Sequence, residues 1–521
     1  MGGDSSAPWQ VLALEMAMQD EEQRLTEYAA DSDDEPKKLT KDSHTRSKKK
    51  DHKKSDIATF FHLLRANLGI WILTLPLAIK NGGYILGPIG MLIIGGMATY
   101  CLGRLVESSS KLCKWNEESS LTYSEAMQLA LQEREASPRI VWIGKYTVNV
   151  SILISQLGFC SIYFVYFGLV LQEIFQQAFC VFISYKVFVA IAIFPLVLYS
   201  CLDNLAPLSF LTKIALTFGL TIVLYDEVHW FYDKKAALIS NEEELNEIGT
   251  VFGISMLLGT TVFTFERTST ILSLESKMKT PSHAKPLVYL SMFIVTLWYT
   301  FFGVFGYLTY GENTMSSVIM NLCPQKIPIT ILMLLIKLLL IFSIFLSHSI
   351  QFYIPMNIIE PEIVRLFTQL AEKLPPMLII YEDAMEKAVR IIYKTSLILF
   401  TAIVAMFISN LGDLLTLIGS LASTTLALIF PSIIHLLTFW KEREEDTKED
   451  TKEDKKEERQ KKTFTCIPLL FVIDIAVIMF GVIVFACGLI ASMYSTVQDF
   501  TLIHDIYIAC PGTCNFSNHQ N

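Results

Sequence analysis

The sequence predicts an all-α polytopic membrane protein that crosses the bilayer about eleven times. Of its 521 residues, 52% are hydrophobic and only 18% are charged, whereas a soluble chain carries about 25% charged residues. Long runs such as Ile329–Leu346 and Ile467–Ala491 contain almost no charge. Inside lipid, such runs must be helices, because every backbone polar group needs a partner within the segment.

The apolar runs are long enough to span the hydrocarbon layer and are separated by polar loops. They divide the chain into a disordered cytosolic tail (1–55), a ten-helix core (56–437), a charged cytosolic linker (438–465), an eleventh transmembrane helix (466–492) and an extracellular or luminal tail (493–521). The spans are expected at 57–80, 84–106, 146–173, 186–202, 206–226, 249–272, 287–308, 328–350, 391–411, 414–437 and 466–492.

Loop charge predicts the direction of insertion, because cytoplasmic loops retain Lys and Arg. With the N-terminus inside, the inner segments hold nine, five, three, five and nine Lys/Arg, and the outer segments hold zero, two, one and zero. We therefore expect a cytosolic N-terminus. The inner segments counted are 37–54, 107–145, 273–286, 351–394 and 438–463, and the outer ones are 174–185, 227–248, 309–327 and 493–521.

Modification signals agree with this orientation. Asn515 begins an Asn-X-Ser glycosylation sequon in the outer tail. Cys180, Cys323, Cys510 and Cys514 also lie in outer segments, where disulfides persist. The pairing Cys180–Cys323 would join two outer loops and Cys510–Cys514 would close a small ring, but spacing alone leaves the connectivity open.

Several classes of function are excluded. The net charge of −9 resides in tails and loops, and it suggests no nucleic-acid partner. The chain has no metal-ligand cluster, phosphate-binding glycine loop or nucleophile–base arrangement, so we expect neither an enzyme nor a bound cofactor or metal. A cleaved signal peptide is not expected either. The basic run 37–54 is expected to be a solvated tail, with anionic lipid or cytosolic partners as the alternative.

Two spans contain residues that interrupt a regular helix. Asn67, Gly69 and Pro76 fall in the first span, and the polar string Gly259–Thr270 falls in the sixth, five spans later. Transporters with inverted repeats break corresponding helices at mid-membrane. The broken ends present N–H groups to a carboxylate and carbonyls to a cation, which is the chemistry that a zwitterion requires.

Ionisable residues within other spans predict structural roles. Glu173, near a span end, is expected to reach the interface. Lys337 is expected to pack against a neighbouring carbonyl, and His348 and His435 are expected to be structural.

Six motifs resemble the proton-assisted amino-acid transporters of the amino acid/auxin permease superfamily, in the same order and with the same loop placement. The resemblance implies a 5+5 inverted repeat plus one helix. It also implies symport of small neutral amino acids (glycine, alanine, proline type), with H⁺ as the coupling ion, at the plasma membrane or a lysosomal or vacuolar membrane. The motifs are Phe61–Gly90, Ser155–Tyr166, Phe263–Pro281, Phe305–Thr314, Ile350–Pro361 and Leu414–Ile433.

The resemblance also implies roles for single residues. His62 matches the histidine to which proton coupling is attributed, and imidazole titrates near neutrality; a structural histidine is the alternative. The other matches are Asn67 and Gly69 at the carboxylate site, Phe263, Phe265 and Glu266 on the opposite wall, and Cys180 with Cys323 as a disulfide.

The chain departs from the family at both interrupted spans. Gly69-Ile70-Trp71 stands where the family has Gly-Thr-Gly, and Glu266-Arg267 stands where it has Glu-Gly. Three hypotheses remain open: Trp71 and Arg267 close the binding pocket, Arg267 recruits an anionic or longer substrate, or both side chains point away and transport is ordinary. The first would make the protein a transport-silent sensor or scaffold.

Overall fold

The structure is a computed structural model, and it describes fourteen stretches of the chain. Nothing is stated below about the remaining residues, which include the predicted N-terminal tail, Cys180, Arg267, Cys323 and Asn515. The described stretches are 55–67, 69–118, 120–179, 183–199, 214–225, 227–228, 245–266, 271–272, 278, 283–321, 327–371, 382–408, 410–449 and 460–501.

Helices account for almost all of the described residues, and no strand occurs there beyond an isolated bridge residue at position 278. The elements are α2 (Asp56–Asn67), η1 (Ile70–Thr74), α3 (Leu75–Gly82), α4 (Leu86–Trp115), α5 (Tyr123–Gln132), α6 (Pro138–Phe179), α7 (Tyr185–Tyr199), α9 (Val251–Phe265), α11 (Ala284–Tyr310), η3 (Gly311–Asn313), η4 (Val318–Asn321), α12 (Ile327–Ala371), α13 (Glu382–Phe407), α14 (Leu411–Ile418), the π-helices η6 (Gly419–Ser423) and η7 (Thr425–Ile429), α15 (Phe430–Glu449) and α16 (Gln460–Thr501).

The prediction of an all-α membrane protein with many spans is confirmed. Seven described helices are long and apolar enough to cross a membrane, and a bent pair, Asp56–Asn67 with Ile70–Gly82, raises the number to eight. Three shorter apolar helices, Tyr185–Val197, Ile214–Tyr225 and Val251–Phe265, lie where further spans are predicted. The total of eleven and the inverted repeat stay predictions.

Helix ends carry the caps that the sequence specifies. Thr250 begins α9 by accepting a hydrogen bond from the Gly253 amide (3.0 Å). Thr122 and Glu125 form a capping box at the start of α5, a ten-residue helix within the predicted cytosolic segment 107–145. Side chains of this kind satisfy amides that have no partner inside the helix.

The end of α3 that precedes α4 is joined to the segment before α9. Gly249 N–H donates to the Gly82 carbonyl (2.8 Å), and Tyr84 N–H donates to the Asn246 carbonyl (3.0 Å). Gly83 has a φ of +85°, a left-handed conformation that favours glycine, and a Cβ there would lie 2.5 Å from the Glu247 carbonyl oxygen.

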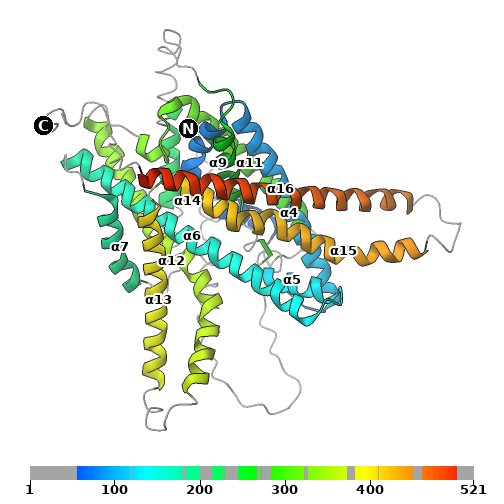
Figure 1. Cartoon of the computed structure of the whole chain (residues 1–521). Helices are drawn as coiled ribbons and strands as arrows, with labels where there is room; N and C mark the ends of the chain where they lie inside the picture. The colour runs from blue at the N-terminus through cyan, green and yellow to red at the C-terminus, as the bar shows by residue number, and fades with distance from the viewer. Residues whose placement is uncertain are drawn as a thin grey trace, which may run out of the picture.

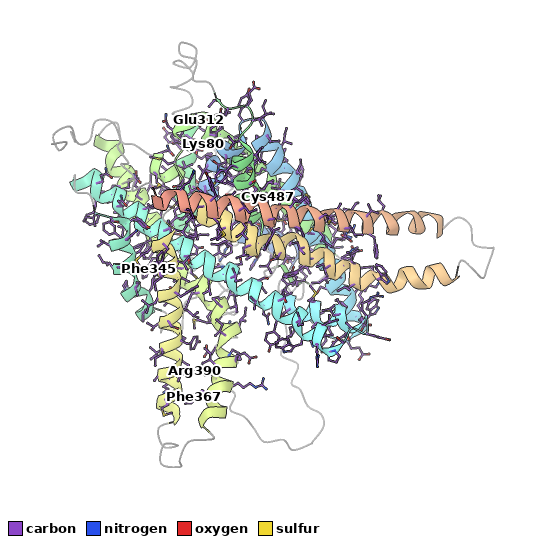
Figure 2. The ribbon with its side chains drawn as sticks, in the orientation of Figure 1. Lys80, Glu312, Phe345, Phe367, Arg390 and Cys487 are labelled. Atoms are coloured by element: carbon purple, nitrogen blue, oxygen red, sulfur yellow. The ribbon has the colours of Figure 1, made fainter. Side chains whose placement is uncertain are left out.

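Glu312, in η3, forms a hydrogen-bonded cluster with three other segments at this end of the molecule. Lys80 Nζ donates to its carbonyl oxygen (2.5 Å), and its carboxylate accepts from Tyr307 Oη (2.6 Å) and Asn246 Nδ2 (2.9 Å). Figure 2 shows Lys80 and Glu312 together, far from Arg390 and Phe367 on the helices that project from the opposite side.

The projecting helices are α12 and α13, which lie side by side (Figure 1). Glu360 of α12 accepts hydrogen bonds from Arg390 and from Tyr393 Oη on α13, the latter at 2.8 Å. These bonds fasten the two projecting helices to each other.

The last helix, α16, runs beside α15 (Figure 1) and packs on it and on α9. Its face toward the core carries Asp474, which is fully buried. Asp474 contacts His435 Nδ1 of α15 at 2.6 Å and accepts from Tyr100 Oη of α4 at 2.9 Å. Both α15 and α16 extend into the segment 438–465, since α15 ends at Glu449 and α16 begins at Gln460.

The expectation for Glu173 of α6 is wrong, because its side chain is buried and does not reach the interface. Lys337 Nζ of α12 donates to Glu173 Oε1 at 2.8 Å, and both side chains are 1% exposed. This ion pair was not predicted for Lys337. The two residues are 164 positions apart, so the hydrophobic pattern around either one gives no indication of the other. The pair joins α6 to α12 inside the helical body.

We expect Lys337→Met to destabilise the protein by about 3–5 kcal/mol, because it leaves the Glu173 carboxylate buried without its cation. The double variant Glu173→Gln/Lys337→Met is expected to recover most of that loss. Thermal unfolding of detergent-purified protein measures both effects. Lys285→Met, which removes a half-exposed partner of Glu107, is the control. A double variant as unstable as Lys337→Met alone would contradict the prediction.

Candidate functional site

The first interrupted helix places a bend inside the membrane-spanning body. Helix α2 ends at Asn67, and η1 begins at Ile70 after an extended Gly69, with a bend of 47° between the two parts. The Asn67 side chain folds back and donates to the Leu63 carbonyl (2.8 Å). Pro76 lies in the first turn of α3, where a missing N–H is tolerated.

Hydroxyl groups from this and other helices donate to carbonyls on both sides of the bend. Tyr299 Oη of α11 donates to the Asn67 carbonyl, and Tyr166 Oη of α6 donates to the Ile70 carbonyl at 3.3 Å. Thr74 Oγ1 donates to the Trp71 carbonyl at 2.6 Å. Without such partners each buried carbonyl would carry a desolvation penalty.

Trp71 lies inside the protein beside this bend. Its side chain is buried (5% exposed), and its Nε1 donates to Tyr299 Oη at 3.3 Å. Its ring meets Phe159 of α6 edge-on, with centroids 5.7 Å apart. The hypothesis that both Trp71 and Arg267 point away is therefore wrong for Trp71, while Arg267 lies outside the described residues.

The second interruption follows α9. Helix α9 ends at Phe265, and Glu266 continues in an extended conformation (φ −74°, ψ 104°). Its side chain is 2% exposed, and Glu266 Oε2 accepts a hydrogen bond from Ser155 Oγ of α6 at 2.7 Å. The sixth span thus carries a buried carboxylate where its helix stops.

Aromatic side chains connect the two interrupted helices. Phe159 contacts both Trp71 and Phe263, the latter with ring centroids 4.5 Å apart, and Phe265 contacts Tyr299 at 5.4 Å. Phe263 and Phe265 are fully buried. The structure therefore brings Trp71 of the first span and Phe263 and Phe265 of the sixth into one cluster.

Helix α9 also approaches η6 closely. A Cβ on Gly419 would lie 2.0 Å from the Gly259 carbonyl oxygen, so no larger residue fits there. Thr260 and Thr416 share a hydrogen bond at 3.0 Å. This π-helical segment, of a kind often found at functional sites, lies against the helix that carries Phe263 and Phe265.

Four residues of the cluster were not predicted as site residues. Phe159, Tyr166 and Ser155 lie within the motif Ser155–Tyr166, which carried the family resemblance without a role for each residue. Tyr299 is one of three tyrosines in the span 287–308, and no local signal distinguishes it from a membrane-facing tyrosine.

His62 lies on α2, five residues before the last residue of that helix. A rise of about 1.5 Å per residue places it roughly 7.5 Å along the axis from Asn67. Its side chain is half-buried. Its role in proton coupling stays a prediction.

The ends of the interrupted helices have opposite polarity. The carboxyl-terminal ends of α2 and α9, together with the Glu266 carboxylate, favour a positive group, and the amino-terminal end of η1 favours a negative one. In the described part of the chain no three His, Cys, Asp or Glu side chains are grouped to hold a metal ion. The arrangement suits a small molecule with both charges.

Two solved structures match most of the chain at low similarity. One is Mhp1, a nucleobase-cation-symport-1 family transporter with bromovinylhydantoin bound (12% identity, TM-score 0.42, covering 86% of this chain and 93% of that one). The other is a Na⁺-coupled sialic acid symporter (11% identity, TM-score 0.41, covering 85% and 96%).

Sequence relatives are similar over most of the chain. The proton-coupled amino acid transporter-like protein pathetic of Drosophila melanogaster is 26% identical over 397 residues, which cover 75% of this chain and 78% of that protein. Amino acid transporter AVT3B of Arabidopsis thaliana is 24% identical over 414 residues, covering 75% and 88%.

A family model described as transmembrane amino acid transporter protein matches residues 52–494. This range includes both interrupted helices and every described helix up to most of α16. The protein therefore belongs to the transmembrane amino acid transporter family, within the amino acid/auxin permease superfamily.

Proposed function

We propose that this amino acid transporter is a proton-coupled symporter of small neutral amino acids. The observation that carries the proposal is the aromatic cluster that joins the two interrupted helices. These helices have ends of both polarities, and the buried Glu266 carboxylate lies at the end of α9. A zwitterion matches these charges. The name of the Drosophila relative, a proton-coupled amino acid transporter-like protein, supports the coupling ion.

Each group has a separate task in this proposal. The backbone amides at the amino-terminal end of η1, which begins just after Asn67 and Gly69, receive the substrate carboxylate, while Glu266 and the carbonyl end of α9 attract its ammonium group. Phe263 and Phe265 form an apolar wall that favours compact side chains. His62 gains and loses the coupled proton, because imidazole titrates near neutrality.

The orientation and membrane belong to the same proposal. The excess of Lys and Arg in alternate loops supports a cytosolic N-terminus. The plasma membrane or a lysosomal or vacuolar membrane provides the proton gradient. The disulfide Cys180–Cys323, glycosylation at Asn515 and partners of the N-terminal tail stay predictions, since they fall outside the described residues.

A second candidate is a transport-silent amino-acid sensor. One observation favours it: the Trp71 side chain lies buried against the bend of the first span, where the family has a glycine. A sensor of this kind would bind an amino acid without transporting it across the membrane.

Uptake of labelled glycine, alanine and proline is expected to rise when the external solution is changed from about pH 7.5 to about pH 5.5, with inward current, because protons drive the cargo. His62→Gln is expected to flatten this profile. The matched control is His283→Gln, which removes an exposed histidine paired with Asp56. Uptake that produces no current and does not change with pH would contradict proton coupling. If the protein reaches the cell surface but transports none of a wide panel of amino acids, the sensor is favoured.

Glu266→Gln is expected to raise the half-saturating amino-acid concentration about tenfold or more, since a hydrogen bond to a charged group contributes about 1.5–3 kcal/mol. The substituted amide keeps the shape and can still accept from Ser155. Ser155→Ala is the companion variant: it keeps the carboxylate, so its effect should be smaller. The concentration dependence of uptake gives the half-saturating concentration of both variants. An unchanged value in Glu266→Gln would show that Glu266 does not belong to the substrate site.

A further inference from the structure

The indole of Trp71 lies directly on the backbone of Gly69. A Cβ added to Gly69 would be 1.9 Å from Trp71 Cη2 and Cζ2 and 2.3 Å from Cε2. Gly69 itself is extended (φ −149°, ψ 167°), a conformation open to any residue. The ring, and not the backbone conformation, therefore requires glycine at position 69.

The ring is fixed at its polar edge by one hydroxyl group. Trp71 Nε1 donates to Tyr299 Oη at 3.3 Å. The same hydroxyl donates to the carbonyl of Asn67, which is the last residue of α2. The Tyr299 ring is itself packed on Phe265. Tyr299 thus links the indole to both interrupted helices.

Only one group can occupy the space over Gly69. A substrate carboxylate that approaches the amino-terminal end of η1 would enter the volume that the indole now fills. The free energy of binding then includes the cost of moving the ring, which lowers the apparent affinity by the fraction of molecules in which the ring has moved.

We propose that Trp71 is a displaceable plug of the substrate site and that Tyr299 is the positioning residue that latches it. The inference rests on the proposed function, because the amino acid is what displaces the plug. Breaking the Trp71–Tyr299 hydrogen bond opens the backbone of Gly69 to a cargo carboxylate. The plug thereby sets the affinity of the site for compact amino acids.

The position of the plug can be tested without transport. Gly69→Ala is expected to lower the unfolding temperature of the purified protein by a few degrees, because its methyl group overlaps the indole. In a Trp71→Ala background the same substitution should cost little. Equal losses in both backgrounds would show that the ring does not cover Gly69 and would overturn the proposal.

The latch is tested by uptake kinetics of glycine and alanine. Tyr299→Phe keeps the ring but removes the hydroxyl, so the half-saturating concentration is expected to fall about three- to tenfold, the equivalent of one hydrogen bond. Trp71→Ala should lower it at least as far. Tyr166→Phe is the matched control: it removes a tyrosine bond to the Ile70 carbonyl and should show no such fall.

The outcomes separate the two proposals. Uptake that appears only in Trp71→Ala or Tyr299→Phe supports the plug. If Tyr299→Phe transports with an unchanged or higher half-saturating concentration, the proposed role of Tyr299 is wrong, and the symporter proposal is unaffected. If no variant that reaches the cell surface shows uptake, the result counts against the proposed function. The unfolding temperatures of Gly69→Ala in the native and Trp71→Ala backgrounds then decide whether the indole fills the site.

Discussion

A helix interrupted within a lipid bilayer releases backbone carbonyls that no water can satisfy, and this constraint governs the centre of the protein. Tyr299 and Tyr166 donate hydrogen bonds from two other helices to carbonyls on either side of the bend, at Asn67 and Ile70. Those tyrosines in turn fix how α6 and α11 pack around the first span. The site is therefore a property of the helix bundle, because residues of α6 and α11 complete it.

Local patterns predicted the fold well because lipid makes the rule for spans simple: about twenty apolar residues form a helix. Asn67 and Gly69 also showed where the first span breaks. The partners could not be predicted, since they come from distant positions: Tyr299 is 228 residues from Trp71, and Glu173 is 164 from Lys337. A pattern of hydrophobicity shows that a polar residue is unusual in a span, but it does not show what the residue meets.

The same reasoning explains how α16 attaches to the bundle. Lipid tails are as apolar as leucine, so apolar surface alone gives a helix little preference for protein over lipid. Its outward residues, such as Val472 and Met479, are exposed. Asp474 supplies the preference, since its contacts with His435 and Tyr100 have no substitute in hydrocarbon. This buried carboxylate acts together with the buried Ser492 hydroxyl, which donates to the Asp413 carbonyl at 2.7 Å, to direct one face of α16 toward the bundle.

Gly69 and Trp71 form a coupled pair, and this changes how the departure from the family is understood. An indole placed two residues after the glycine would clash with any side chain at position 69, so the remaining glycine now accommodates the ring. A glycine that elsewhere lets a ligand approach the backbone here lets a side chain do so. The bend keeps its two helix ends, the sixth span keeps its buried carboxyl group at Glu266, and the chain's own aromatic ring covers Gly69. Any cargo for this site competes with a residue that is permanently present at high effective concentration.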